Sequence, residues 1–90
     1  MFKHRAPRRA VRRDFRLETP AGALPAVMRN VSATGMLVEA EGFFSPGDRV
    51  SFGLMGQRIA ARVVSVHRGC VSIAFLKHLS EREIRMLVQG

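Results

Sequence analysis

Hydrophobic and polar positions alternate in short runs along most of this chain, which is the pattern of half-buried β-strands. In residues 14–19 (DFRLET), Phe15 and Leu17 alternate with charged neighbours. In residues 49–54 (RVSFGL), an apolar side chain again occupies every second position. Four further runs have a similar character: LPAVMRNV, MLVEA, QRIAARVVSVH and CVSIAFL. The pattern therefore predicts six short strands.

Turn-forming residues separate these runs at short, regular intervals. Proline presets one backbone angle of a turn and glycine accepts positive ones, so both mark the ends of strands. The predicted turns are PAG at 20–22, SATG at 32–35, SPGD at 45–48, GQ at 56–57 and RG at 68–69. Evenly spaced turns between short strands are typical of a small barrel. We therefore predict an all-β fold, a six-stranded antiparallel β-barrel.

The spacing of apolar residues changes at the C-terminus, in LSEREIRMLVQG. Ser80 and Glu83 have the three-residue spacing of a capping box, which marks the start of a helix. Ile84, Leu87 and Val88 fall on one helical face. We therefore predict a short C-terminal α-helix that packs its apolar stripe on one end of the barrel.

Positive charge is concentrated at the N-terminus. Of the formal net charge of +8, residues 1–16 supply +6, and six of the seven basic residues there are arginines. The segment contains Pro7 and lacks sustained periodicity, so we predict a flexible basic arm over residues 1–13 and a barrel domain over residues 14–90. Guanidinium groups grip phosphates in a bidentate manner and stack on planar rings, so the arm favours a planar anionic partner.

The residue combinations of an enzyme do not occur in this sequence. His4, His67 and His78 lie far apart in different settings, and there is no glycine-rich phosphate loop. We therefore expect no catalysis, no metal site and no cofactor. Cys70 is the single cysteine, which favours a reducing compartment. No apolar run suits a membrane span or a signal peptide, so we expect no membrane span and a cytoplasmic location.

The stretch MRNVSATGMLVEA combines polar side chains with a glycine at a strand end. Asn30 and Ser32 are two residues apart, so on a strand they would project from the same face and offer an amide beside a hydroxyl. Gly35 would let a ligand approach the backbone. As plain structure, the same residues would form a turn in which polar side chains bond to their own backbone.

Asn30, Ser32 and Gly35 match the [Asp/Asn]-x-Ser-x-x-Gly signature of the PilZ domain family, which this chain resembles over essentially its whole length. The closing segment ARVVSVHRGCVSIAFLKHLSEREIRML and the turn FFSPGDRVSF also resemble that family. Its second motif is Arg-x-x-x-Arg, located upstream. The arm offers this spacing three times, as Arg5 with Arg9, Arg8 with Arg12, and Arg9 with Arg13.

The resemblance implies a single-domain receptor for cyclic di-GMP, a bacterial second messenger, that passes its signal to an unidentified effector protein. Two arm arginines would engage phosphates and guanine edges, or stack on guanine faces. Asn30 and Ser32 would hydrogen-bond a guanine, and Gly35 would leave room beside it. The implied ligand-binding residues are Arg5, Arg8, Arg9, Arg12, Arg13, Asn30, Ser32 and Gly35.

Two alternative functions remain open at this point. The first is a degenerate PilZ adaptor that binds no nucleotide and acts only through protein–protein contacts. The second is a basic β-barrel that binds single-stranded nucleic acid, but the chain has no Trp or Tyr to serve as a stacking platform, so nucleic acid is not the expected partner. The sequence also leaves open which arginine pair acts, the ligand stoichiometry, the process controlled and the oligomeric state.

Overall fold

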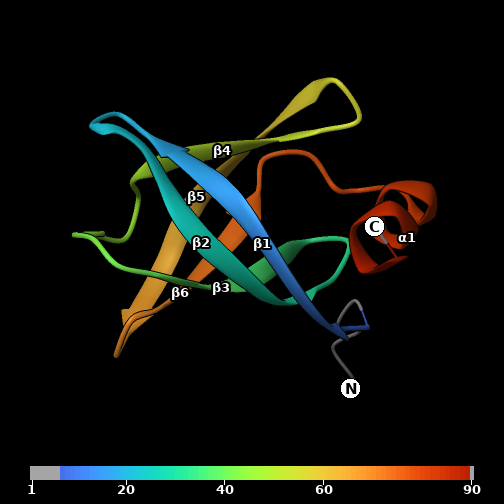
Figure 1. Cartoon of the computed structure of the whole chain (residues 1–90), viewed down its shortest axis with the longest axis horizontal. Coiled ribbons are helices and arrows are strands. Elements are labelled where there is room, and N and C mark those ends of the chain that lie inside the picture. Colours follow the sequence, from blue (N-terminus) through green and yellow to red (C-terminus); the bar gives the residue numbers. More distant parts are fainter. Residues whose placement is uncertain (1–6, 90) are drawn as a thin grey trace, which may run out of the picture.

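Six antiparallel strands close into a barrel in the computed structural model, which describes residues 7–89 (Figure 1). The order around the barrel is β1-β2-β3-β6-β5-β4. The predicted fold class is therefore confirmed. The strands are β1 (Arg9–Thr19), β2 (Gly22–Val31), β3 (Gly35–Ala40), β4 (Arg49–Leu54), β5 (Gln57–His67) and β6 (Cys70–Phe75).

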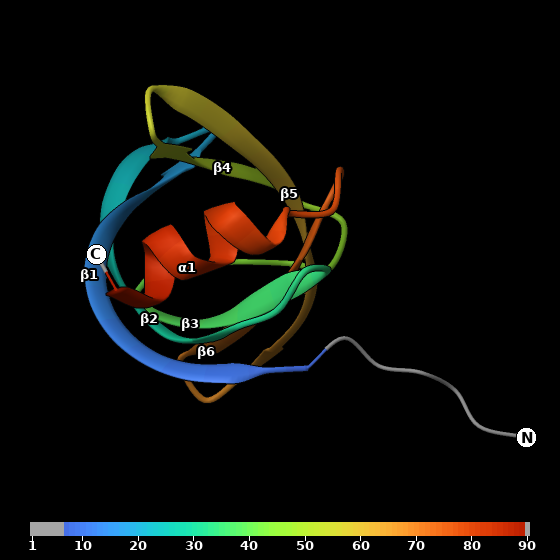
Figure 2. The ribbon, with the colours of Figure 1, turned by 90° about the vertical axis from the view of Figure 1, so that its right-hand side faces the viewer.

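The predicted C-terminal helix is also present, as α1 (Glu81–Gln89). Figure 2 looks at the barrel from one end and shows α1 lying across that opening. Ile84 and Leu87 of α1 are buried and join the core of the barrel. Within residues 7–89, no helix is both long and apolar enough to cross a membrane.

Alternate residues of the strands point inward and form one apolar core. Phe52 lies near its centre, with ring centroids 5.6 Å from Phe15 and 6.2 Å from Phe75. Burying one such side chain contributes about 1.5–3 kcal/mol, so the core is the main source of stability. The side chains that are at most 1% exposed include Leu17, Met28, Val31, Met36, Val38, Val63, Val71 and Ile73.

The barrel closes where β1 meets β4, through a single pair of residues, Glu18 and Ser51. Arg58 of β5 reinforces this junction, since it forms an ion pair with Glu18 and donates a hydrogen bond to Ser51 Oγ at 3.2 Å. The N-terminal half of β1 runs instead beside α1.

The first strand begins at Arg9, five residues earlier than the alternation of residues 14–19 predicted. Ala10 pairs with Asn30 of β2, and Arg13 pairs with Met28. Val11 and Arg12 of β1 thus lie opposite a single residue of β2, Arg29, which is a β-bulge. Val11 and Arg13 are more buried than Ala10, Arg12 and Asp14, so the two-residue period continues through the bulge. The segment is rich in arginine, also on its inner face, so the apolar pattern did not reveal the strand. The structure therefore places residues 9–13, expected as part of the arm, within the sheet.

The capping box predicted for α1 is confirmed. The Ser80 backbone N–H donates to Glu83 Oε1 at 2.8 Å, and the Glu83 N–H donates to Ser80 Oγ at 3.1 Å. These hydrogen bonds from Ser80, backbone first, lower the pKa of the Glu83 carboxyl, and the nearby Lys77 acts in the same direction. The ionised carboxylate therefore stabilises the folded state.

The lowered pKa of Glu83 predicts that the effect of Glu83→Gln on the stability of the protein depends on pH. The pKa of Glu83 is lower in the folded protein than in the unfolded chain. Its ionised carboxylate therefore stabilises the folded state fully at pH values above the unfolded-chain pKa of about 4.3, and this stabilisation is lost as the pH falls through the lower pKa of the folded protein. Urea unfolding should show wild type more stable than Glu83→Gln at pH 7, with a smaller difference at pH 3. Glu41→Gln, in an exposed loop, is the matched control. A difference between wild type and Glu83→Gln that is constant with pH would contradict the assignment.

Candidate functional site

The pairing of β1 with β2 determines which way the arginines of the N-terminal segment point. Directly paired residues in an antiparallel ladder have side chains on the same face of the sheet. Arg9 pairs with Val31, which is fully buried, so Arg9 lies on the inner face, towards α1. Ala10 pairs with Asn30, so Ala10 lies on the outer face, and Arg8 lies there as well because its side chain contacts Asn30.

The structure brings Arg8 and Asn30 together on this outer face. Arg8 Nη1 donates a hydrogen bond to Asn30 Oδ1 at 2.6 Å. Asn30 is half-buried, and its partner in the neighbouring strand β3 is Leu37, which pairs in turn with Ser72 of β6. A guanidinium and an amide therefore lie side by side above a short row of small and apolar side chains.

Arg9 and Arg13 contact α1 instead of the outer face. Arg9 forms an ion pair with Glu81 in the first turn of the helix. Arg13 Nη1 donates to the backbone carbonyls of Met86 at 3.1 Å and Leu87 at 3.3 Å. A cation at this position satisfies carbonyls that have no partner within the helix and offsets the helix dipole.

Apolar burial contributes more to the position of α1 than these polar contacts do. The side chains of Arg9 and Glu81 are 42% and 56% exposed, and such a surface ion pair is worth about 0.2–1 kcal/mol. Burial of Ile84 and Leu87 is worth about 1.5–3 kcal/mol for each side chain. The two arginines therefore orient a helix that is already held by its apolar face.

The remaining arginines of the predicted set differ in position. Arg12 is exposed and lies in the bulged part of β1, between Ala10 and Arg13. Arg5 lies outside the described residues, so the pair of Arg5 with Arg9 has no structural description.

Ser32 does not lie beside Asn30 on the outer face, and the expectation that it does is wrong. Ser32 is 1% exposed, and its Oγ accepts a hydrogen bond from the Thr34 N–H at 3.2 Å. The Ser32 N–H donates to the Gly35 carbonyl at 2.8 Å. The physical reason is that β2 ends at Val31, so the alternation of a strand does not continue to Ser32. The hydroxyl stabilises the turn at 32–35 instead, which was the plain structural interpretation.

The space beside Gly35 is occupied by the protein's own backbone. A Cβ atom at Gly35 would lie 2.2 Å from the carbonyl oxygen of Ile73, which is impossible without movement of β6. Gly35 pairs with Ala74, so the glycine permits β3 and β6 to approach closely. The structure thus assigns Gly35 a packing role that the sequence did not reveal.

Two features near this site were missed from the sequence. A second bulge, between Met28 and Asn30 in the β2–β3 ladder, accompanies the exposed side chain of Arg29, which forms an ion pair with Glu39. Leu37 becomes a neighbour of Asn30 only through strand pairing. No local signal in the sequence indicates such registers. Among residues 7–89, no group of three His, Cys, Asp or Glu side chains could hold a metal ion.

Comparison with known proteins adds one finding to this geometry. A family model described as the PilZ domain matches residues 2–90, which is essentially the whole chain. A comparison with curated proteins gives no match.

The close approach at Gly35 predicts a large effect of Gly35→Ala. The added methyl group must displace the β6 backbone, so the free energy of unfolding should fall by about 2–3 kcal/mol. Urea unfolding measures this change. Gly53→Ala in β4 is the matched control, because a Cβ there meets nothing closer than the Gln57 carbonyl oxygen at 4.0 Å. Equal stability of Gly35→Ala and Gly53→Ala would show that β3 does not approach the Ile73 carbonyl of β6 as closely as described.

The contact of Arg13 with α1 predicts a local effect of Arg13→Ala. Loss of its hydrogen bonds should let the last turn of α1 open more often, by about fivefold, which corresponds to about 1 kcal/mol. Amide hydrogen exchange of residues 81–89 detects this opening. Arg62→Ala, which removes the same charge from an exposed site on β5, should leave these rates unchanged. If both variants behave alike, Arg13 has no specific role at the helix.

Proposed function

Because this chain belongs to the PilZ domain family, whose members generally bind cyclic di-GMP, we propose that it is a cytoplasmic receptor for this second messenger. It acts as an adaptor that performs no reaction and needs no cofactor. Its signal passes to an effector protein that recognises the bound form. Domains of this family are binding modules, which supports this role.

The contact of Arg8 with Asn30 is the observation that supports this proposal most directly. It holds a guanidinium fork and an amide at one place on the outer face, at the start of β1. The O6 and N7 atoms of guanine and the phosphate oxygens are acceptors that suit such a fork. When ligand binds, Arg8 exchanges a neutral amide acceptor for a charged or bidentate one, which favours the bound state.

The positions of the arginines favour Arg8 with Arg12 as the functional pair. Arg9 and Arg13 contact α1, and recruiting them would require their helix contacts to break. Arg8 and Arg12 are exposed, so binding breaks only the bond from Arg8 to Asn30. The dianionic ligand can thus contact two guanidinium groups while only one hydrogen bond within the protein is lost.

Ser32 and Gly35 support the site indirectly in this proposal. The hydroxyl of Ser32 stabilises the turn that follows Asn30, and Gly35 allows β3 to pack against β6. Both are positioning residues, because they determine where Asn30 lies without contacting the ligand.

A second candidate function is an adaptor that binds no nucleotide. The observation in its favour is that Ser32 and Gly35 are engaged within the protein, and not presented to a ligand. Absence of nucleotide binding in the following experiment would select it.

Isothermal titration calorimetry with cyclic di-GMP tests the proposal. We expect selective binding over GTP and over a single-stranded oligonucleotide, weakened at least about tenfold, or about 1.4 kcal/mol, in Arg8→Ala and in Asn30→Ala. Arg62→Ala controls for the loss of one positive charge and should bind like wild type. Arg9→Ala should also bind within about threefold of wild type, since Arg9 is assigned to the helix.

Several results would contradict the assignment. If Arg8→Ala and Arg62→Ala weaken the binding of cyclic di-GMP equally, the loss comes from the lower net charge and not from a contact of Arg8 with the ligand. A loss confined to Arg9→Ala would select another arginine pair. Preference for the oligonucleotide, with affinity that falls steeply with salt, would indicate a nucleic-acid binder.

A further inference from the structure

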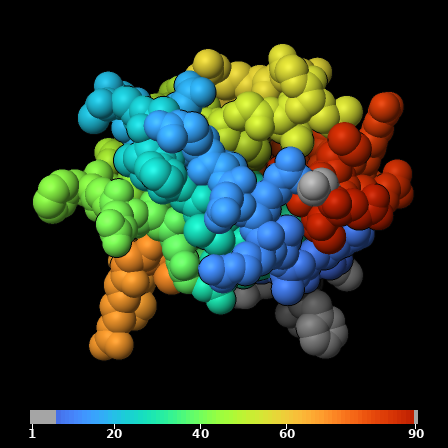
Figure 3. All heavy atoms as spheres, in the orientation of Figure 1, coloured from blue at the N-terminus to red at the C-terminus, as the bar shows by residue number. Residues whose placement is uncertain are grey.

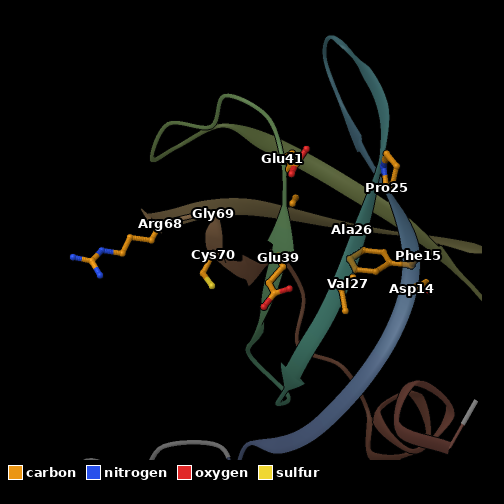
Figure 4. A pocket seen from close by; sticks show the side chains of 11 residues that line it. Asp14, Phe15, Pro25, Ala26, Val27, Glu39, Glu41, Arg68, Gly69 and Cys70 are labelled. Carbon is orange, nitrogen blue, oxygen red and sulfur yellow. The ribbon is translucent and has the colours of Figure 1, made fainter.

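A recess lies at the end of the barrel opposite α1, and it is lined by residues outside the proposed nucleotide site. Its volume is about 810 Å³, within the range of ligand-binding pockets. It is bounded by β1, β2, β3 and the turn between β5 and β6 (Figure 4). Figure 3 shows the loop after β3 and the β5–β6 turn as two projections with a hollow between them. We propose that this recess docks a basic segment with apolar side chains from a partner protein.

The lining of the recess offers apolar surface. Phe15 and Val27 are only half-buried, and Pro25 is exposed. Ala26 and Ala40, which complete the apolar part, have small side chains that leave the surface hollow. Apolar side chains of a partner can therefore leave water on entering the recess, which stabilises a complex.

The loop that leaves the recess at Glu41 carries an exposed aromatic residue. Phe43 is fully exposed, with a relative exposure of 105%, and lies two residues after Glu41, which lines the recess. Its neighbour Phe44 packs against the core, so the loop is anchored while Phe43 points into solvent. Burying an exposed phenylalanine contributes about 1.5–3 kcal/mol, and large aromatic side chains are frequent anchors of protein interfaces.

The charge of the recess indicates the chemistry of the partner. Asp14, Glu39 and Glu41 line it against one cation, Arg68, although the whole chain carries +8. Glu39 is paired with Arg29, so Asp14 and Glu41 are the carboxylates that face a partner. An anionic ligand such as a nucleotide is disfavoured here, whereas Lys or Arg side chains of a partner complement the site.

The net charge of the whole chain argues against a second copy as the occupant. Two molecules that each carry +8 repel one another as they approach. A short basic segment of another protein brings only local positive charge to the carboxylates. Docking at this recess goes beyond the proposed nucleotide binding, because it uses a different set of residues.

Fluorescence anisotropy with two labelled nonapeptides tests this proposal. The probes are alternating Lys-Leu and alternating Glu-Leu sequences, each titrated with the full chain at moderate salt. We expect saturable binding of the Lys-Leu peptide only, with amide NMR shifts confined to residues 14–15, 26–27, 39–43 and 68–70. Phe43→Ser and Glu41→Lys should each weaken binding at least fivefold. Met55→Ser removes an exposed apolar side chain elsewhere and is the matched control.

The outcomes separate this proposal from its competitors and from nucleotide binding. Absence of Lys-Leu binding, equal binding by Phe43→Ser, or NMR shifts at α1 and residues 8–13 would overturn it. Self-association in analytical ultracentrifugation that disappears in Phe43→Ser would assign the recess to a second copy and also overturn it. Phe43→Ser should bind cyclic di-GMP with the affinity of the wild-type protein. Peptide docking and nucleotide binding are therefore tested independently, and the failure of one does not decide the other.

Discussion

The pairing of β1 with β2 around Ala10 and Asn30 is the constraint on which the rest of the site depends. Because side chains alternate along a strand, this one register sends Arg9 inward to α1 and leaves Arg8 outside, beside Asn30. A shift by one residue would exchange these roles. Arg13 lies four residues after Arg9 and therefore on the same, helix-facing side of β1, so one strand both orients α1 and presents an arginine to solvent.

The rigid part of the site is the turn that follows Asn30. Ser32 bonds within it, and the glycine at position 35 lets β3 lie against the Ile73 carbonyl of β6. Asn30 therefore stands on a fixed scaffold, while Arg8 lies just before a strand that is held by β2 and α1. The two ends of the barrel differ accordingly, with arginines near α1 and carboxylates around the opposite recess.

Most of the fold followed from local patterns in the sequence, whereas the site followed only in part. Alternation and turn residues predicted the strands, and the Ser80–Glu83 spacing predicted the helix start, because these signals arise from neighbours along the chain. The inward position of Ser32 and the packing role of Gly35 were not predictable, since they depend on where β2 ends and on the approach of β6. The start of β1 at Arg9 was hidden because arginines occupy inward as well as outward positions there, as the helix contacts of Arg9 and Arg13 show.

The register of β1 on β2 can be measured directly by NMR on the ligand-free protein. The account predicts short interproton contacts between the backbones of Ala10 and Asn30. It also predicts that amides of residues 9–13 bonded to β2 exchange more slowly than those of an unstructured peptide, on the order of a hundredfold. Exchange at unstructured rates, or contacts from Ala10 to a residue one position away from Asn30, would contradict it.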